Sequence, residues 1–75
     1  MTPYIDPKLA ILRRKEVEKK IGLSRSTIYA LMDAKSPYHD PSFPKPISLG
    51  AKAVGWIETE LDSWLYNRMN SRFHN

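Results

Sequence analysis

Four side chains within the ten-residue segment 22–31 carry groups well suited to hydrogen bonding with a large polar ligand. They are Arg25, Ser26, Thr27 and Tyr29. An arginine can bond guanine O6 and N7 at once, and a serine or threonine hydroxyl can reach a base. A tyrosine can bond a phosphate or stack on a base. The set therefore predicts readout of nucleic-acid bases, with the alternative that Tyr29 is half-buried and Arg25 is merely solvated.

A helix over residues 24–34 would position these groups. Ser24 suits its N-terminal cap, because a serine hydroxyl can accept a hydrogen bond from a free amide of the first turn. At about 100° per residue, an apolar side and an outer side separate. The apolar side holds Thr27, Ile28, Leu31, Met32 and Ala34, and the outer side holds Arg25, Ser26, Tyr29, Ala30 and Asp33. The polar groups lie near the positive end of the helix dipole.

A shorter helix over residues 14–21 precedes this segment. Val17 and Ile21 are four residues apart and share one face, and almost everything around them is charged. Gly22 supplies the left-handed stop that commonly ends a helix. Two helices joined by a glycine-containing turn indicate a helix-turn-helix. We expect Lys15, Lys19 and Ser24 to contact phosphates, with a solvated helix face as the alternative for the lysines.

A proline-rich connection and a small β-hairpin follow. Four prolines between residues 35 and 46 exclude a regular element there, and we expect Tyr38 and Phe43 to anchor this loop. Strands over 47–49 and 53–56 flank a turn at residues 50–52. An isolated hairpin is marginal, so it should pack on the helices. The residues expected to do so are Ile47, Leu49, Val54 and Trp56. We expect Lys45 and Lys52 to contact phosphates from this wing, although the hairpin could be purely structural.

A last amphipathic helix is predicted over residues 57–71, with apolar side chains at helical spacing. Trp56 and Trp64 are the largest hydrophobic groups and should dominate the core. The fold class is therefore mainly α with a small β-hairpin, a winged helix-turn-helix over residues 11–72. Residues 1–10, with Pro3 and Pro7, are predicted to form a flexible N-terminal arm.

Composition narrows the classes of function. A chain of 75 residues is one small domain that buries only about 60% of its unfolded surface. It has no cysteine, two distant histidines and no paired carboxylates or glycine-rich phosphate loop, so we expect no enzyme, metal, cofactor or small-molecule substrate. No apolar run is long enough to span a membrane, and a cytoplasmic location at the bacterial nucleoid is expected. The net charge of +4 suits a nucleic-acid partner.

The order of these segments resembles one known family. The carrying residues are Leu-Arg-Arg-Lys-Glu-Val from Leu12, Gly-Leu-Ser-Arg-Ser-Thr-Ile-Tyr from Gly22, Phe-Pro-Lys-Pro-Ile-Ser-Leu-Gly from Phe43, Ala-Val-Gly-Trp from Ala53, and Leu61 with Trp64 and Leu65. Together they resemble the AlpA family of phage and prophage regulatory proteins. The resemblance implies a winged helix-turn-helix akin to MerR-type and excisionase-type domains. Two departures are Ala30, where the family often has a basic residue, and a longer connection over 34–42.

The expected function is sequence-specific binding to double-stranded DNA. The resemblance implies a transcriptional regulator of a prophage or genomic island that activates integrase or excision functions. One alternative is a recombination directionality factor, or excisionase, that acts architecturally on DNA. Another is a protein-interaction module that does not bind DNA. A single small module makes few contacts, so self-association on tandem sites is also expected.

Overall fold

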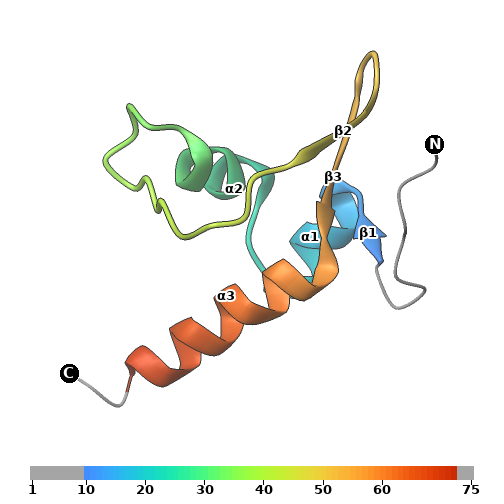
Figure 1. Ribbon diagram of the computed structural model, residues 1–75. Coiled ribbons are helices and arrows are strands. Elements are labelled where there is room, and N and C mark those ends of the chain that lie inside the picture. Colours follow the sequence, from blue (N-terminus) through green and yellow to red (C-terminus); the bar gives the residue numbers. More distant parts are fainter. Residues whose placement is uncertain (1–9, 73–75) are drawn as a thin grey trace.

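The computed structural model describes residues 10–72, and within them the chain forms three helices and one small antiparallel sheet (Figure 1). The elements follow in the order β1 (Ile11–Leu12), α1 (Arg14–Ile21), α2 (Arg25–Met32), β2 (Ile47–Gly50), β3 (Ala53–Ile57) and α3 (Glu58–Ser71). The arrangement confirms the predicted mainly helical class with a hairpin, consistent with a winged helix-turn-helix. The arm predicted over 1–10 lies, except for Ala10, outside the described residues and stays a prediction.

The junction between α1 and α2 forms as the sequence predicts. Gly22 ends α1 with φ 72° and ψ 23°, and its amide donates to the Glu18 carbonyl over 2.8 Å. A residue with a Cβ pays a steric cost at such a positive φ, so glycine fits this position. Ser24 then caps α2, where its Oγ accepts a hydrogen bond from the Thr27 amide.

The end of α2 requires a correction, because the helix stops at Met32 and not at residue 34. Asp33 adopts an extended conformation with φ −83° and ψ 114°. Its side-chain Oδ1 accepts a hydrogen bond from the Lys35 amide over 2.9 Å. Aspartate side chains commonly bond the backbone two residues onward and so favour a turn over a further helical turn.

The sheet contains one strand more than the sequence indicated. The strand order is β1-β3-β2, with Ile11 opposite Ile57 and Leu12 opposite Trp56. The predicted hairpin is present, each strand being one residue longer at its C-terminal end than predicted. A Cβ on Gly55 would lie 2.5 Å from Ile11 Cγ2, so the added strand β1 requires glycine at this position of β3.

The core lies where the three helices meet the base of the hairpin. Its buried members are Val17, Ile28, Leu31, Phe43, Trp56, Leu61 and Trp64. The rings of Phe43 and Trp64 meet edge to face with centroids 5.0 Å apart. The predicted central role of Trp56 and Trp64 is confirmed, and so is the burial of Phe43.

Two packing predictions were wrong. Ile47, Leu49 and Val54 were expected to pack on the helices, but each is 36–43% exposed. The hairpin projects away from the helices (Figure 1). Of the four residues expected to pack on the helices, only Trp56 at its base belongs to the buried core. Tyr38 was expected to anchor the loop, yet it is 73% exposed. Alternation within a strand separates two faces but does not reveal whether a neighbour covers either face.

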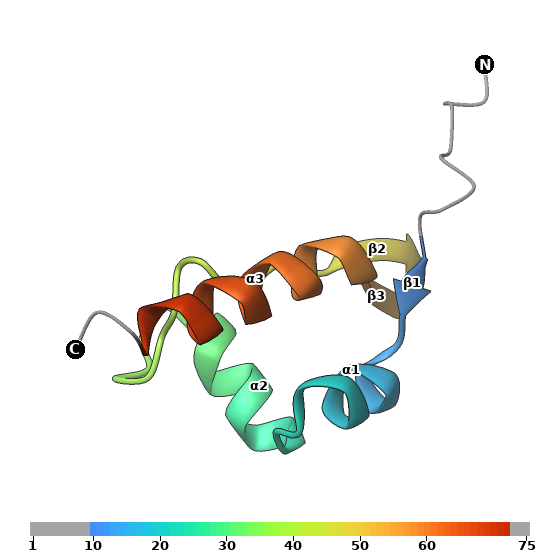
Figure 2. The same ribbon diagram turned by 90° about the horizontal axis from the view of Figure 1, so that it is seen from below.

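The helices α1 and α2 lie side by side on the same side of α3, with the sheet near the N-terminal end of α3 (Figure 2). Lys20 joins α1 to α3, since its Nζ is 2.9 Å from Asp62 Oδ1 and 3.2 Å from Glu58 Oε2. These two carboxylates, Asp62 foremost, raise the pKa of Lys20. Within the described residues, no helix is both long and apolar enough to cross a membrane.

Candidate nucleic-acid interface

The exposed side of α2 carries all four predicted base-reading residues. Arg25, Ser26, Thr27 and Tyr29 are exposed, whereas Ile28 and Leu31 are buried against the other helices. Tyr29 is 44% exposed and Arg25 is exposed, so the alternative of a half-buried tyrosine beside a solvated arginine stays open. The predicted set is therefore accessible, and the assignment of Thr27 to the apolar side was wrong because that residue is exposed at the edge of the buried stripe.

Three of these side chains already make local contacts. The Arg25 guanidinium carbon lies 5.5 Å from the centre of the Tyr29 ring, within the range of a cation–π interaction. This contact limits the freedom of Arg25 and places its donors beside the phenol. Thr27 Oγ1 lies 3.0 Å from Ser24 Oγ and takes part in the helix cap. The methyl group of Thr27 is left as the more available part of this exposed side chain.

A groove lies on the hairpin side of α2, which we call the wing-side groove. Its volume is about 360 Å³, and its lining residues are Arg13, Arg14, Lys15, Tyr29, Lys52 and Val54. The cations come from the start of α1 and from the turn between β2 and β3. No lining residue of this groove, within the described part of the chain, carries a carboxylate.

The lining cations of the wing-side groove differ in their partners. Arg14 forms an ion pair with Glu18 one turn along α1. Arg13 has extended backbone before the helix, with φ −84° and ψ 166°, and its amide donates to Glu16 Oε1 over 2.9 Å. Pairing of β1 with β3 brings this junction toward the hairpin, so the groove depends on the short strand β1.

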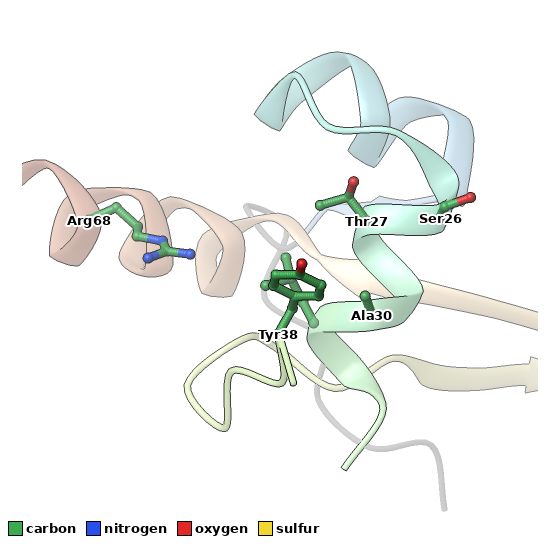
Figure 3. A pocket seen from close by; sticks show the side chains of 6 residues that line it. Ser26, Thr27, Ala30, Tyr38 and Arg68 are labelled. Carbon is green, nitrogen blue, oxygen red and sulfur yellow. The ribbon is translucent and has the colours of Figure 1, made fainter. Parts of the chain in front are cut away.

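A second groove lies on the opposite side of α2, and we call it the α3-side groove. Its volume is about 490 Å³, and its lining residues are Ser26, Thr27, Ala30, Leu31, Tyr38 and Arg68. Figure 3 shows Arg68 extending from α3 toward Tyr38 and the exposed side of α2. The exposed face of α2 therefore stands between two grooves of different composition.

The family is decided by comparison with known proteins. Residues 10–69 match the family model described as prophage CP4-57 regulatory protein (AlpA). This chain belongs to the AlpA family. The fold and the family therefore both agree with the resemblance seen in the sequence.

Two relatives illustrate the range of the AlpA family. The chain is 52% identical over 58 residues to "DNA-binding transcriptional activator AlpA" of Escherichia coli (strain K12), covering 77% of this chain and 83% of that protein. It is 41% identical over 61 residues to "Uncharacterized protein ORF88" of Enterobacteria phage P4, covering 81% of this chain and 62% of that protein. The first relative is a transcriptional activator and not an enzyme, as expected for this chain. No solved structure matches the chain significantly.

The predicted phosphate contacts of this AlpA family member divide into two groups. Lys15 and Lys52 line the wing-side groove together. Lys45 lies apart from them, in a hollow formed with Met32 and the loop. Lys19 is exposed on α1, and Ser24 is engaged in the cap of α2. The structure thus brings only two of the five together.

Sequence reasoning missed four residues that line the two grooves: Arg13, Arg14, Tyr38 and Arg68. The basic run Arg13-Arg14-Lys15 was a signal for Arg13 and Arg14, although only Lys15 of the three was predicted to contact a phosphate. No local signal marks Tyr38 or Arg68, which meet across thirty residues of chain. Among the residues described, no group of three His, Cys, Asp or Glu side chains could hold a metal ion.

Proposed function

We propose that this AlpA family member is a sequence-specific double-stranded DNA-binding protein that activates transcription in a prophage or genomic island. The observation that carries the proposal is the wing-side groove, where four cations lie beside Tyr29 of α2. The Escherichia coli relative, a "DNA-binding transcriptional activator" at 52% identity, supports the same class of function. The regulated genes would encode integrase or excision functions.

The proposed complex places α2 in the major groove, as in other helix-turn-helix domains. The donors of Arg25, Ser26 and Tyr29 would face base edges, and the Thr27 methyl would suit contact with a thymine methyl. Because Arg25 lies over Tyr29, the guanidinium is partly ordered before binding. Partial ordering lowers the entropic cost of a bidentate bond to guanine.

Phosphates beside the major groove would meet the wing-side groove. Lys15 and Lys52 would contact one strand from two sides, together with the missed residues Arg13 and Arg14. Backbone contacts of this kind fix the register of a protein on DNA without reading its sequence. Lys19, Lys45 and Ser24 stay proposed phosphate contacts outside this groove.

Binding can be tested by fluorescence anisotropy on a duplex selected from a random-sequence library. With about four to six phosphates neutralised, log K should fall against log salt concentration with a slope of about −4 to −5. A random duplex of equal length is the control for specificity. A dissociation constant unchanged between about 50 and about 200 mM salt would contradict the proposal.

Activation is tested separately from binding. A reporter fused to the promoter of a neighbouring integrase gene should respond to the protein, and the response should disappear when the selected site is scrambled. An excision assay run with the same protein covers the architectural alternative. Excision that proceeds without any change in transcription would reassign the protein as a recombination directionality factor.

A further inference from the structure

We propose that the α3-side groove binds the sugar-phosphate backbone of the second DNA strand, with Arg68 as its phosphate contact and Tyr38 packing beside it. The inference rests on the proposed function and extends it to residues of α3 and of the long loop. It assigns the DNA backbone as the ligand of a groove that no residue of the hairpin lines.

The first support is the position of the groove relative to α2. Ser26 and Ala30 line it, and both belong to the outer side of the helix, away from buried Ile28. An α-helix with its side chains is about 10–12 Å across, close to the width of the major groove at about 12 Å. A helix seated there has one phosphate backbone on each side. The wing-side and α3-side grooves flank α2 in that same manner.

The second support is charge. Arg68 is the cationic residue among those lining the α3-side groove, and its side chain is 57% exposed. Its guanidinium can offer paired donors to phosphate oxygens. No carboxylate is among the described residues that line this groove, and the Asp40 carboxylate beside Arg68 lies outside that lining.

The third support is that Arg68 is held in place. Its guanidinium carbon lies 4.9 Å from the centre of the Trp64 ring, and Nη2 is 3.8 Å from Asp40 Oδ2. Asp40 is itself fixed, since Oδ2 accepts from Trp64 Nε1 over 3.0 Å and Oδ1 accepts from the Ser42 hydroxyl over 2.6 Å. These contacts restrict the guanidinium, and a restricted guanidinium loses less entropy on meeting a phosphate.

The fourth support is the shape and lining of the groove. Ala30 presents only a methyl group, which leaves the space between α2 and Arg68 open. Tyr38 is 73% exposed and lies between Arg68 and α2 in Figure 3. The groove offers an apolar surface to a deoxyribose, formed by Ala30, Leu31 and the ring of Tyr38. The Tyr38 hydroxyl can donate to a neighbouring phosphate.

The test is strand-resolved hydroxyl-radical footprinting on a selected duplex, combined with affinities over a range of salt. Lys52→Gln should weaken protection on one strand, and Arg68→Gln should weaken it on the other strand. Arg68→Gln should also reduce affinity for all sequences by about threefold to tenfold and lower the salt slope by about 1. Arg68→Lys should restore the slope, because it restores the charge.

Tyr38→Ala gives a second, independent variant, since its exposed side chain contributes little to folding. It should reduce protection on the Arg68 strand, whereas Tyr66→Ala, 63% exposed on α3 and outside both grooves, should leave the footprint unchanged. Circular dichroism of each variant verifies the fold.

Three outcomes would overturn the inference. In the first, Arg68→Gln and Tyr38→Ala keep wild-type slope and protection while Lys52→Gln loses them, which leaves the proposed function standing. In the second, the Arg68 variant alters only cooperativity between copies, which assigns the groove to a protein neighbour. In the third, the wild-type protein shows no salt-dependent binding, which removes the proposed function as well.

Discussion

The two sides of α2 offer contrasting ways to bind a polyanion. The wing-side groove gathers Arg13, Arg14, Lys15 and Lys52 around Tyr29, so its strength lies in the number of cations. The α3-side groove has Arg68 as its cation, and this side chain is held by Trp64 and by an aspartate of the long loop. Several cations together provide affinity and salt dependence, whereas a single positioned cation provides orientation. We therefore expect the wing-side groove to attract DNA and the α3-side groove to align it.

The largest effect, on the stability of the fold, should follow removal of the Trp64 side chain beside the α3-side groove. Trp64→Ala deletes a 6% exposed ring that packs on Phe43 and carries Arg68 and Asp40. Loss of a buried tryptophan costs about 3–5 kcal/mol of stability. A domain of this size should then be largely unfolded at room temperature, as measured by thermal unfolding followed by circular dichroism.

Tyr66→Ala is the matched control on the same helix, since that ring is 63% exposed. Its melting temperature should stay close to that of the wild type. Cooperative unfolding of Trp64→Ala within a few degrees of the wild type would show that the α3 side does not depend on this ring.

The next effect should come from the cations of the wing side. Arg13→Gln combined with Lys52→Gln removes two charges contributed by separate segments of the groove. Affinity for cognate and random duplexes should fall together by about 10–100-fold near 0.1 M salt, and the salt slope should fall by about 2. The charge-preserving pair Arg13→Lys and Lys52→Arg should retain the slope. Unequal losses on the two duplexes would mean that these residues read sequence.

A smaller and more selective effect is expected between the two grooves. Arg25→Ala should remove about 1–3 kcal/mol of discrimination between the selected duplex and a random duplex, because arginine bonds guanine bidentately. Its affinity for random DNA should change much less. Arg68→Gln is the comparison, since it should weaken both duplexes alike. Equal losses for Arg25→Ala on the two duplexes would remove its base-reading role.

The smallest effect is the pH dependence of stability that Asp40 contributes. Hydrogen bonds to the Asp40 carboxylate, from the Ser42 hydroxyl first and then from Trp64, lower the pKa of Asp40 below 3.8. The resulting stabilisation is complete above pH 3.8 and is lost as pH falls through the lower pKa of the folded state. Asp40→Asn lacks this contribution, so its stability difference from the wild type should shrink in acid.

Urea unfolding at about pH 6 and about pH 2 measures that difference. Asparagine has one acceptor oxygen for the bonds from Trp64 and Ser42, so the change in this difference with pH, and not its size at one pH, reports the charge. An equal difference at both pH values would show that the Asp40 charge does not support the α3 side.

Local signals in the sequence were sufficient for the helices and the hairpin. The spacing of Val17 and Ile21, the stop at Gly22 and the cap at Ser24 each predicted what the structure contains. The strand β1 could not be predicted, because two residues carry no periodicity and gain their place only by pairing with β3. The early end of α2 follows from a side-chain bond of Asp33 that competes with the helix.

The candidate site was predictable on one side of α2 only. Its wing side joins the start of α1 to Tyr29 and to the turn of the hairpin, and the charges of Lys15 and Lys52 within predicted elements were enough to select them. The α3 side joins Tyr38 to Arg68 through the path of a proline-rich loop, which propensity does not determine. The packing of that loop on Trp64, and not any motif, creates the second groove.

Methylation interference on a selected duplex tests most directly whether α2 reads bases in the major groove. Dimethyl sulfate modifies guanine N7 in the major groove and adenine N3 in the minor groove. We expect methylation at one or more guanine N7 atoms to block binding of the wild-type protein, and Arg25→Ala to become insensitive at one of them. Interference confined to adenine N3, with every guanine N7 tolerated, would contradict the claim.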